Sequence, residues 1–100
     1  MYIQVAAPEA IKLDQNYPNP FTANTKIGFE LPAEGRVTLE LYDILGRKVD
    51  RLVDDDMPAG FHNFEYSANH LASGVYFYLL RAKGQDGEMR IFQNKMILAK

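Results

Sequence analysis

Apolar and polar residues alternate along much of the chain, and this period of two predicts β-strands rather than helices. The run over residues 25–31 separates Ile27, Phe29 and Leu31 from Lys26, Gly28 and Glu30, and Pro32 ends it. A second run over residues 36–41 separates Val37, Leu39 and Leu41 from Arg36, Thr38 and Glu40. Because only residues 33–35 remain for a turn, we expect the two runs to form an antiparallel hairpin.

The next two predicted strands are joined to their neighbours by a tight turn and an acidic loop. Gly46 and Arg47 belong to a turn over residues 43–47, in which glycine can adopt a positive φ. In the strand over residues 48–53 the alternation slips between Val49 and Leu52, which indicates a bulge or an edge strand. Residues 54–60, which end at Gly60, are expected to form an exposed acidic loop before a short strand around residues 63–66.

The last third of the chain predicts a central strand and a closing strand. Ser73 and Gly74 open a run over residues 75–83 that is apolar or aromatic on both faces, as in a strand at the middle of a sheet. A hairpin turn over residues 84–87 leads to a final strand over residues 88–99, with Phe92, Met96 and Leu98 facing inward. We therefore expect an all-β fold, an antiparallel β-sandwich of about seven strands.

The length, charge and cysteine content of the chain exclude several classes of function. A chain of 100 residues is one domain with a real core but little area for a deep substrate pocket, which favours a binding surface over a cleft. Eleven basic and thirteen acidic residues give a net charge of −2, so no broad positive field is available for nucleic acid. The absence of cysteine excludes disulfides and thiolate metal sites without fixing the compartment.

Residues 1–12 differ from the rest of the chain. They lack the basic start and long apolar block of a secretory signal, and no run in the chain approaches the roughly twenty apolar residues that cross a bilayer. We therefore expect no membrane insertion. Residues 1–12 are interpreted as a linker or an added segment, residues 13–100 as the domain, and the whole as a fragment of something longer.

No set of residues predicts catalysis, a metal ion or a cofactor. His62 and His70 are separated by eight positions, and Ser67 and Ser73 could in principle act as nucleophiles, but no nucleophile elbow or regular ligand spacing accompanies them. The three aspartates at residues 54–56 lack the alternating oxygen ligands of a calcium loop. The sequence predicts a protein that is not an enzyme.

Two aromatic segments have both a structural and a binding interpretation. Residues 16–21 form a stiff turn fixed by two prolines, and Tyr17 and Phe21 are expected to cover one open end of the sandwich. Tyr76 is expected to hydrogen-bond backbone at a sheet corner. Alternatively, Tyr76 and Tyr78 could display a stacking platform for a sugar or a peptide.

Read in order, these segments resemble one known family, the type A C-terminal sorting domain (Por secretion tail) of the type IX secretion system. The first block comprises Leu13, Gln15, Asn16, Tyr17, Pro18, Asn19, Pro20, Phe21, Thr25, Ile27, Leu31 and Pro32. The second comprises Val37, Leu39, Tyr42, Asp43, Gly46, Arg47 and Val49, and the third Ala59, Gly60 and His62. The fourth comprises Leu71, Ser73, Gly74, Val75, Tyr76, Phe77 and Tyr78, and the last Lys95, Met96, Leu98 and Lys100. Thr22 and Ala23 depart from the usual Asn and Pro, and Leu79 takes a place that is often Arg.

The resemblance implies an immunoglobulin-like sandwich at the end of a larger secreted protein of a Bacteroidota-type Gram-negative bacterium. In that family a signal peptide brings the fused upstream cargo to the periplasm, and the folded tail directs it through the outer-membrane translocon to the cell surface. A surface sortase then commonly cuts upstream of the tail. No cofactor is implied.

The resemblance and the strand pattern together suggest how the tail is recognised. We expect the closing hairpin to hold the final strand rigid, so that Lys95, Met96, Ile97, Leu98 and Lys100 are presented to a receptor at little ordering cost. The alternative is an immunoglobulin-like accessory module of an extracellular enzyme, which would bind glycan through exposed tyrosines.

Overall fold

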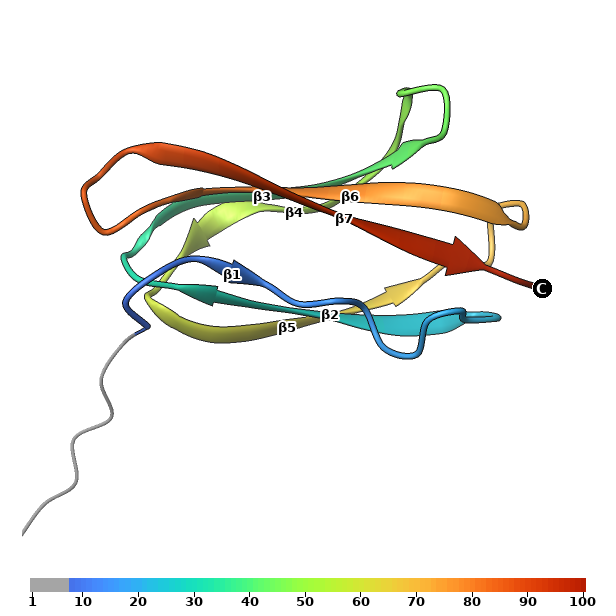
Figure 1. The fold of residues 1–100 in the computed structure, drawn as a ribbon, viewed down its shortest axis with the longest axis horizontal. Coiled ribbons are helices and arrows are strands. Elements are labelled where there is room, and N and C mark those ends of the chain that lie inside the picture. The colour runs from blue at the N-terminus through green and yellow to red at the C-terminus, as the bar shows by residue number, and fades with distance from the viewer. Residues whose placement is uncertain (1–7) are drawn as a thin grey trace, which may run out of the picture.

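The structure of the chain is a computed structural model that describes residues 8–100. Within that range the chain forms seven strands and no helix (Figure 1). The strands are β1 (Lys12–Leu13), β2 (Asn24–Leu31), β3 (Gly35–Asp43), β4 (Lys48–Met57), β5 (Gly60–Ser67), β6 (Gly74–Lys83) and β7 (Met89–Leu98). It follows that no helix in the described part of the chain is long and apolar enough to cross a membrane.

The strands form two sheets that pack face to face. One sheet has the order β1-β2-β5 and the other the order β4-β3-β6-β7, and all neighbouring strands are antiparallel (Figure 1). The core between them contains the apolar side chains that the alternation assigned to inward faces, among them Ile27, Phe29, Leu31, Val37, Leu39 and Leu41. The predicted all-β, immunoglobulin-like sandwich is confirmed.

The predicted hairpin between residues 25–31 and 36–41 is wrong. β2 pairs with β1 and β5, whereas β3 pairs with β4 and β6, so the chain crosses from one sheet to the other at residues 32–34. Alternation shows that one face of each strand is buried, and that holds equally for neighbours in one sheet and for strands that face each other across the core. The apolar faces of β2 and β3 meet across the core.

β4 confirms one prediction and corrects another. It lies at the edge of its sheet, and its register against β3 shifts twice, skipping Leu52 and then Val49, where the sequence predicted a bulge or an edge. The predicted acidic loop is instead the second half of β4, since Asp54 pairs with Thr38 and receives two hydrogen bonds from Arg36, at 2.6 and 3.1 Å. An edge strand accommodates such charges because its side chains remain solvated.

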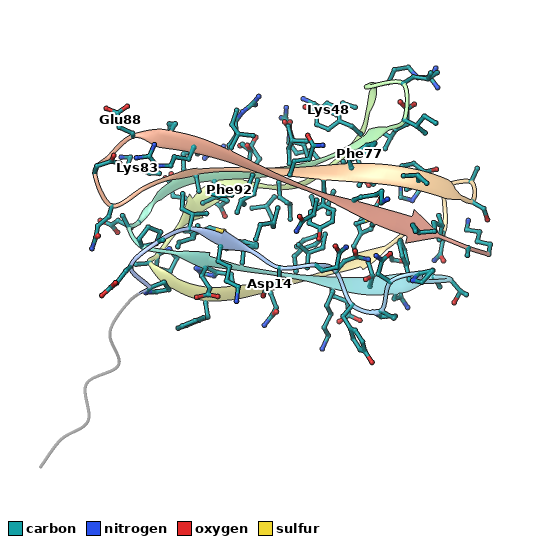
Figure 2. The ribbon with its side chains drawn as sticks, viewed as in Figure 1. Asp14, Lys48, Phe77, Lys83, Glu88 and Phe92 are labelled. Carbon is teal, nitrogen blue, oxygen red and sulfur yellow. The ribbon has the colours of Figure 1, made fainter. Side chains whose placement is uncertain are left out.

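The last two strands lie as predicted. β6 is central, paired along its length with β7 and over residues 76–81 with β3, and its inward side chains include the fully buried Tyr78 and Leu80. On β7, Met96 and Leu98 are buried and Phe92 packs against the core as a partly buried residue. Figure 2 shows Phe92 directed between the sheets and Phe77 on the outer side of β6.

The packed part of the chain begins upstream of Leu13. Ile11 is only 9% exposed and belongs to the core, and Lys12 pairs with Glu30 of β2. The rest of the predicted linker, residues 1–7, lies outside the described residues.

Candidate functional site

The final strand divides its side chains between the core and the solvent. Met96 and Leu98 are 0% and 1% exposed, so their side chains are not available to a partner of the folded domain. Lys95 is exposed and Ile97 half-buried on the opposite face of the sheet, where their cross-strand partners are Phe77 and Val75. Of the five residues predicted to be recognised, two therefore anchor the strand and three lie at the surface.

Lys100, the third of these surface residues, closes the end of the strand against a neighbouring loop. Its backbone amide donates to the hydroxyl oxygen of Ser73 at 3.0 Å, and its Nζ donates to the carbonyl of Asn69 at 3.0 Å. These two bonds hold the last residue of the chain beside residues 68–73.

The segment before β2 clamps the outer edge of β7. The Phe21 amide donates to the Ile97 carbonyl at 3.0 Å and the Phe21 carbonyl accepts from the Ala99 amide at 2.8 Å, which forms a parallel bridge. The Asn19 side-chain oxygen accepts from the Ile97 amide at 2.8 Å, and the Gln15 side chain donates to the Lys95 carbonyl at 2.6 Å. We call Gln15, Asn19 and Phe21 the edge clamp, because together they bond the Lys95 carbonyl, both outward backbone groups of Ile97 and the Ala99 amide.

The buried side chain of Asn16 connects the clamp segment to β2. Its side chain is buried and donates to the hydroxyl of Thr25 at 3.0 Å and to the carbonyl of Pro18 at 3.2 Å. The peptide bonds before Pro18 and Pro20 are both cis. The predicted turn is therefore present, but as a clamp on the terminal strand.

The predicted role of the two aromatic residues in this turn is half right. Phe21 is buried as expected, whereas Tyr17 is 80% exposed and covers nothing. The backbone of Tyr17 exchanges two hydrogen bonds with Lys26, at 2.9 and 2.8 Å, which fixes residue 17 on β2. Since successive side chains of an extended segment point to opposite sides, the inward Asn16 turns Tyr17 to the solvent.

Tyr78 links the central strand to the segment that precedes the clamp. Its hydroxyl donates to the Asp14 carbonyl at 2.7 Å and accepts from the Asn16 amide at 2.9 Å. Burial raises the pKa of Tyr78, so the hydroxyl stays protonated and remains a donor. Asn94 of β7 donates to the same Asp14 carbonyl at 3.2 Å, which brings β6, β7 and residues 14–16 together.

The glycan platform of the alternative interpretation is wrong, because neither tyrosine is displayed. Tyr78 is fully buried and Tyr76 is 8% exposed. The Tyr76 hydroxyl donates to the Ala72 carbonyl at 2.6 Å, which confirms the predicted bond to backbone at the sheet corner. Ser73 and Gly74, the first residue of β6, lie between Ala72 and Tyr76.

Gly46 of the second motif block lies in the tight turn between β3 and β4. Gly46 has φ 81°, a left-handed conformation that other residues rarely adopt. The Asp43 carboxylate accepts from the amides of Leu45 and Arg47 at 2.9 and 3.0 Å, and from the Arg47 guanidinium at 2.8 Å. These bonds lower the pKa of Asp43, with the backbone amide of Arg47 the largest cause. Gly60 also has a positive φ, 133°, at the start of β5.

The two histidines contact groups with a structural role. His62 Nε2 lies 2.8 Å from the Pro58 carbonyl, and His70 Nε2 lies 3.2 Å from an Asp50 oxygen that also accepts from the Tyr66 hydroxyl. Within residues 8–100, no group of three or more His, Asp or Glu side chains is arranged to hold a metal ion.

The sequence analysis assigned no hydrogen-bonding role to two residues of the site, of which Gln15 appeared only as a position of the family resemblance. Gln15 and Asn94 bond the backbone of distant segments, Lys95 and residues 13–14 respectively. A signal existed for Asn94, a polar residue at an inward position between Phe92 and Met96, because an inward amide must find hydrogen-bond partners. The motif block marks Gln15 as a position, but nothing in the sequence indicates its hydrogen-bond partner, which is 80 positions away.

Comparison with known proteins agrees with this geometry. A family model described as the secretion system C-terminal sorting domain matches residues 15–94, which span the edge clamp, strands β2 to β6 and the first six residues of β7. No curated protein matches the chain. The chain therefore belongs to the family of secretion system C-terminal sorting domains, the signals that direct proteins exported by the type IX system through the periplasm to the cell surface or the extracellular space.

Proposed function

We propose that the type IX translocon recognises the surface of the terminal strand, through Lys95, Ile97 and Lys100, while Met96 and Leu98 anchor that strand in the core. The observation that carries the proposal is the double attachment of residues 95–99. β6 pairs with one edge of the strand and the edge clamp bonds the other. A strand held on both edges loses little conformational entropy when a partner binds it.

The charges of this surface suit recognition by an acidic partner. None of the described acidic residues forms an ion pair with Lys95 or Lys100, whereas many other basic side chains are paired, for example Arg36 with Asp54 and Arg47 with Asp43. An unpaired charge at the rim of an interface steers association and adds specificity.

The wider assignment takes residues 13–100 as the sorting domain and residues 1–12 as the segment that leads to a fused upstream cargo, although Ile11 and Lys12 of that segment already pack on the fold. A surface sortase would cut within this segment. The domain itself contributes no catalysis in this scheme. The family membership supports the role with the type IX machinery, and the packing of Ile11 in the core favours a cut upstream of residue 11.

The experiment fuses a signal-bearing reporter upstream of residues 1–100 in a bacterium that has the type IX translocon. A deletion of residues 95–100 would remove the buried Met96 and Leu98 and so confuse misfolding with loss of recognition. Substituting the two surface charges, Lys95→Glu with Lys100→Glu, leaves the core intact. We expect the reporter to remain in the periplasm.

The matched control is Lys26→Glu, which reverses an exposed lysine on the other sheet. It should leave export unchanged. Normal surface delivery of the Lys95→Glu, Lys100→Glu variant would overturn the proposed recognition surface, and failure of the unchanged fusion to leave the periplasm would overturn the sorting role.

A further inference from the structure

The edge clamp covers only the second half of β7. In an antiparallel strand the backbone groups of successive residues point alternately to the two edges. The groups of Ile97 point outward, since they bond Asn19 and Phe21, and those of Ile91, Gln93 and Lys95 share that direction. Of these outward groups, the carbonyl of Lys95 is bonded to Gln15.

The first half of β7 is therefore an open edge. None of the described residues donates to or accepts from the outward amides and carbonyls of Ile91 and Gln93, or the outward amide of Lys95. We call this stretch, residues 91–95, the open edge. It has no bulge against β6, and Ile91 is 57% exposed. An unpaired, regular edge with an apolar side chain is a template for another strand.

The edge strand at the opposite side of the same sheet has features that oppose pairing. β4 is interrupted by two register shifts and carries three consecutive aspartates, Asp54 to Asp56. Bulges and charges of one sign are the usual protection of an edge against strand addition. The contrast between β4 and β7 indicates that the open edge is available for pairing.

The side chains around the open edge select the partner. The outward-facing positions of β7 carry Ile91, Gln93 and Lys95 and no acidic residue, and Arg81 of β6 lies beside Ile91. A second copy of the chain would add the same basic residues to this face without a compensating carboxylate. An extended segment with an acidic residue opposite Lys95 and an apolar residue opposite Ile91 complements it.

We propose that the open edge of β7 binds an extended acidic segment of the export machinery by strand addition, so that the partner strand continues the four-stranded sheet at residues 91–95. This inference rests on the proposed function and specifies its binding mode. Backbone hydrogen bonds supply affinity, and the Lys95 and Ile91 side chains supply specificity. The edge clamp ends the partner strand at residue 95, because beyond it the outward groups of β7 are already bonded.

The test removes one outward amide. Gln93→Pro eliminates the N–H that a partner would bond, and a proline is tolerated there because that amide has no partner within the described fold. The matched control, Gln93→Ala, loses the same side chain but keeps the amide. In the reporter fusion we expect Gln93→Pro to lower surface delivery about tenfold relative to Gln93→Ala.

A second set of variants tests the charge of Lys95 and needs no proline substitution. Lys95→Glu should lower delivery and Lys95→Arg should retain it, because only the first places like charges together. Thermal unfolding of each purified variant reports folding, and if Gln93→Pro proves unfolded, Ile91→Pro against Ile91→Ala replaces it.

The outcomes separate the two proposals. If the unchanged fusion is not delivered, the proposed function fails. If it is delivered and the folded proline variant is delivered equally, strand addition fails while the sorting role stands. If sedimentation shows that the unchanged chain forms a dimer that Gln93→Pro abolishes, the open edge binds a second copy, and the acidic partner is overturned. If Lys95→Glu is delivered normally, the acidic character of the partner is overturned.

Discussion

Among single residues, Tyr78 makes a testable contribution to stability, because its buried hydroxyl forms two hydrogen bonds with the backbone. It bonds the Asp14 carbonyl and the Asn16 amide, and its replacement in Tyr78→Phe leaves that amide without a partner. The Asp14 carbonyl keeps its bond from Asn94. We expect a loss of about 1–3 kcal/mol in the free energy of unfolding, the cost of one buried group left unsatisfied. Urea unfolding followed by circular dichroism measures it.

The control for this substitution is Tyr17→Phe, which removes a hydroxyl from a ring that is 80% exposed. Its stability should match that of the unchanged chain. Equal stabilities of Tyr78→Phe and Tyr17→Phe would contradict the role assigned to the buried hydroxyl.

Glu40 is a second residue whose environment predicts a measurable effect. It is 4% exposed on the outer side of β3 and lies within 4 Å of three cations, Lys48 at 2.7 Å, Arg51 at 3.1 Å and Arg81 at 3.7 Å. The hydrogen bond from Lys48 is the largest cause of a lowered pKa, against the opposing effect of burial. The folded state therefore favours the ionised carboxylate.

Glu40→Gln should destabilise the domain at neutral pH by about 1–2 kcal/mol, less than a fully buried pair because the three cations are partly solvated. A lowered pKa contributes stability that is fully present above the ordinary value of 4.5 and is lost as the pH falls through the folded value. The difference between the unchanged chain and the variant should therefore shrink below pH 4.5. Unfolding at a series of pH values measures it.

The control is Glu65→Gln on β5, an exposed carboxylate without an ion pair among the described residues. Its effect should be small at every pH. A difference between Glu40→Gln and the unchanged chain that persists undiminished in acid would show that the contribution of Glu40 does not depend on its charge.

At the scale of elements, the edge clamp predicts how firmly the terminal strand is held. Asn19→Ala removes the acceptor of the Ile97 amide. One lost bond of about 1 kcal/mol corresponds to roughly fivefold faster local opening. Amide hydrogen exchange at Ile97 and Ala99 measures this, and Asn63→Ala on β5, an exposed position, is the control. Unchanged exchange at Ile97 would mean that β6 alone holds the strand.

The comparison of sequence and structure shows what a pattern along the chain can determine. Alternation identified the strands, the central position of β6 and the irregularity of β4, because each depends on which local side chains are buried. It placed β2 and β3 in one sheet, because the same pattern describes strands that face each other across a core. It also ended β4 at the aspartates, where pairing with β3 continues.

Less of the site than of the fold could be predicted from the sequence, because the contacts of the site join residues that are far apart along the chain. The motif at residues 16–21 was identifiable by its prolines, and Tyr76 by its place at the start of a late strand. The contacts that make the motif a clamp join residues separated by nearly 80 positions, as with Asn19 and Ile97. No periodicity encodes such a contact, so a covering role was expected for Tyr17 where the structure places its ring in solvent.

For the whole molecule, the structure predicts that the export machinery recognises the folded domain rather than the final residues as an unfolded peptide. Met96 and Leu98 are buried among residues of both sheets, so the recognised surface of β7 exists only while the sandwich is folded. Leu39→Ala with Leu41→Ala empties two fully buried positions on β3 and leaves every residue of β7 and of the edge clamp in place. The two substitutions together should cost about 4–10 kcal/mol, comparable to the entire stability of a small domain.

The matched control on the same strand is Thr38→Val. The Thr38 hydroxyl oxygen is buried without a hydrogen-bond partner among the described residues, so a methyl group of similar size should leave stability unchanged or improve it. We expect the double alanine variant to hold its reporter in the periplasm and Thr38→Val to deliver it normally, as judged by protease accessibility at the cell surface. Full delivery by a double variant shown to be unfolded would mean that the machinery reads the final residues as a linear peptide. If delivery instead falls in proportion to the unfolded fraction, the machinery recognises β7 only in its folded form, in which β6 and the edge clamp hold it.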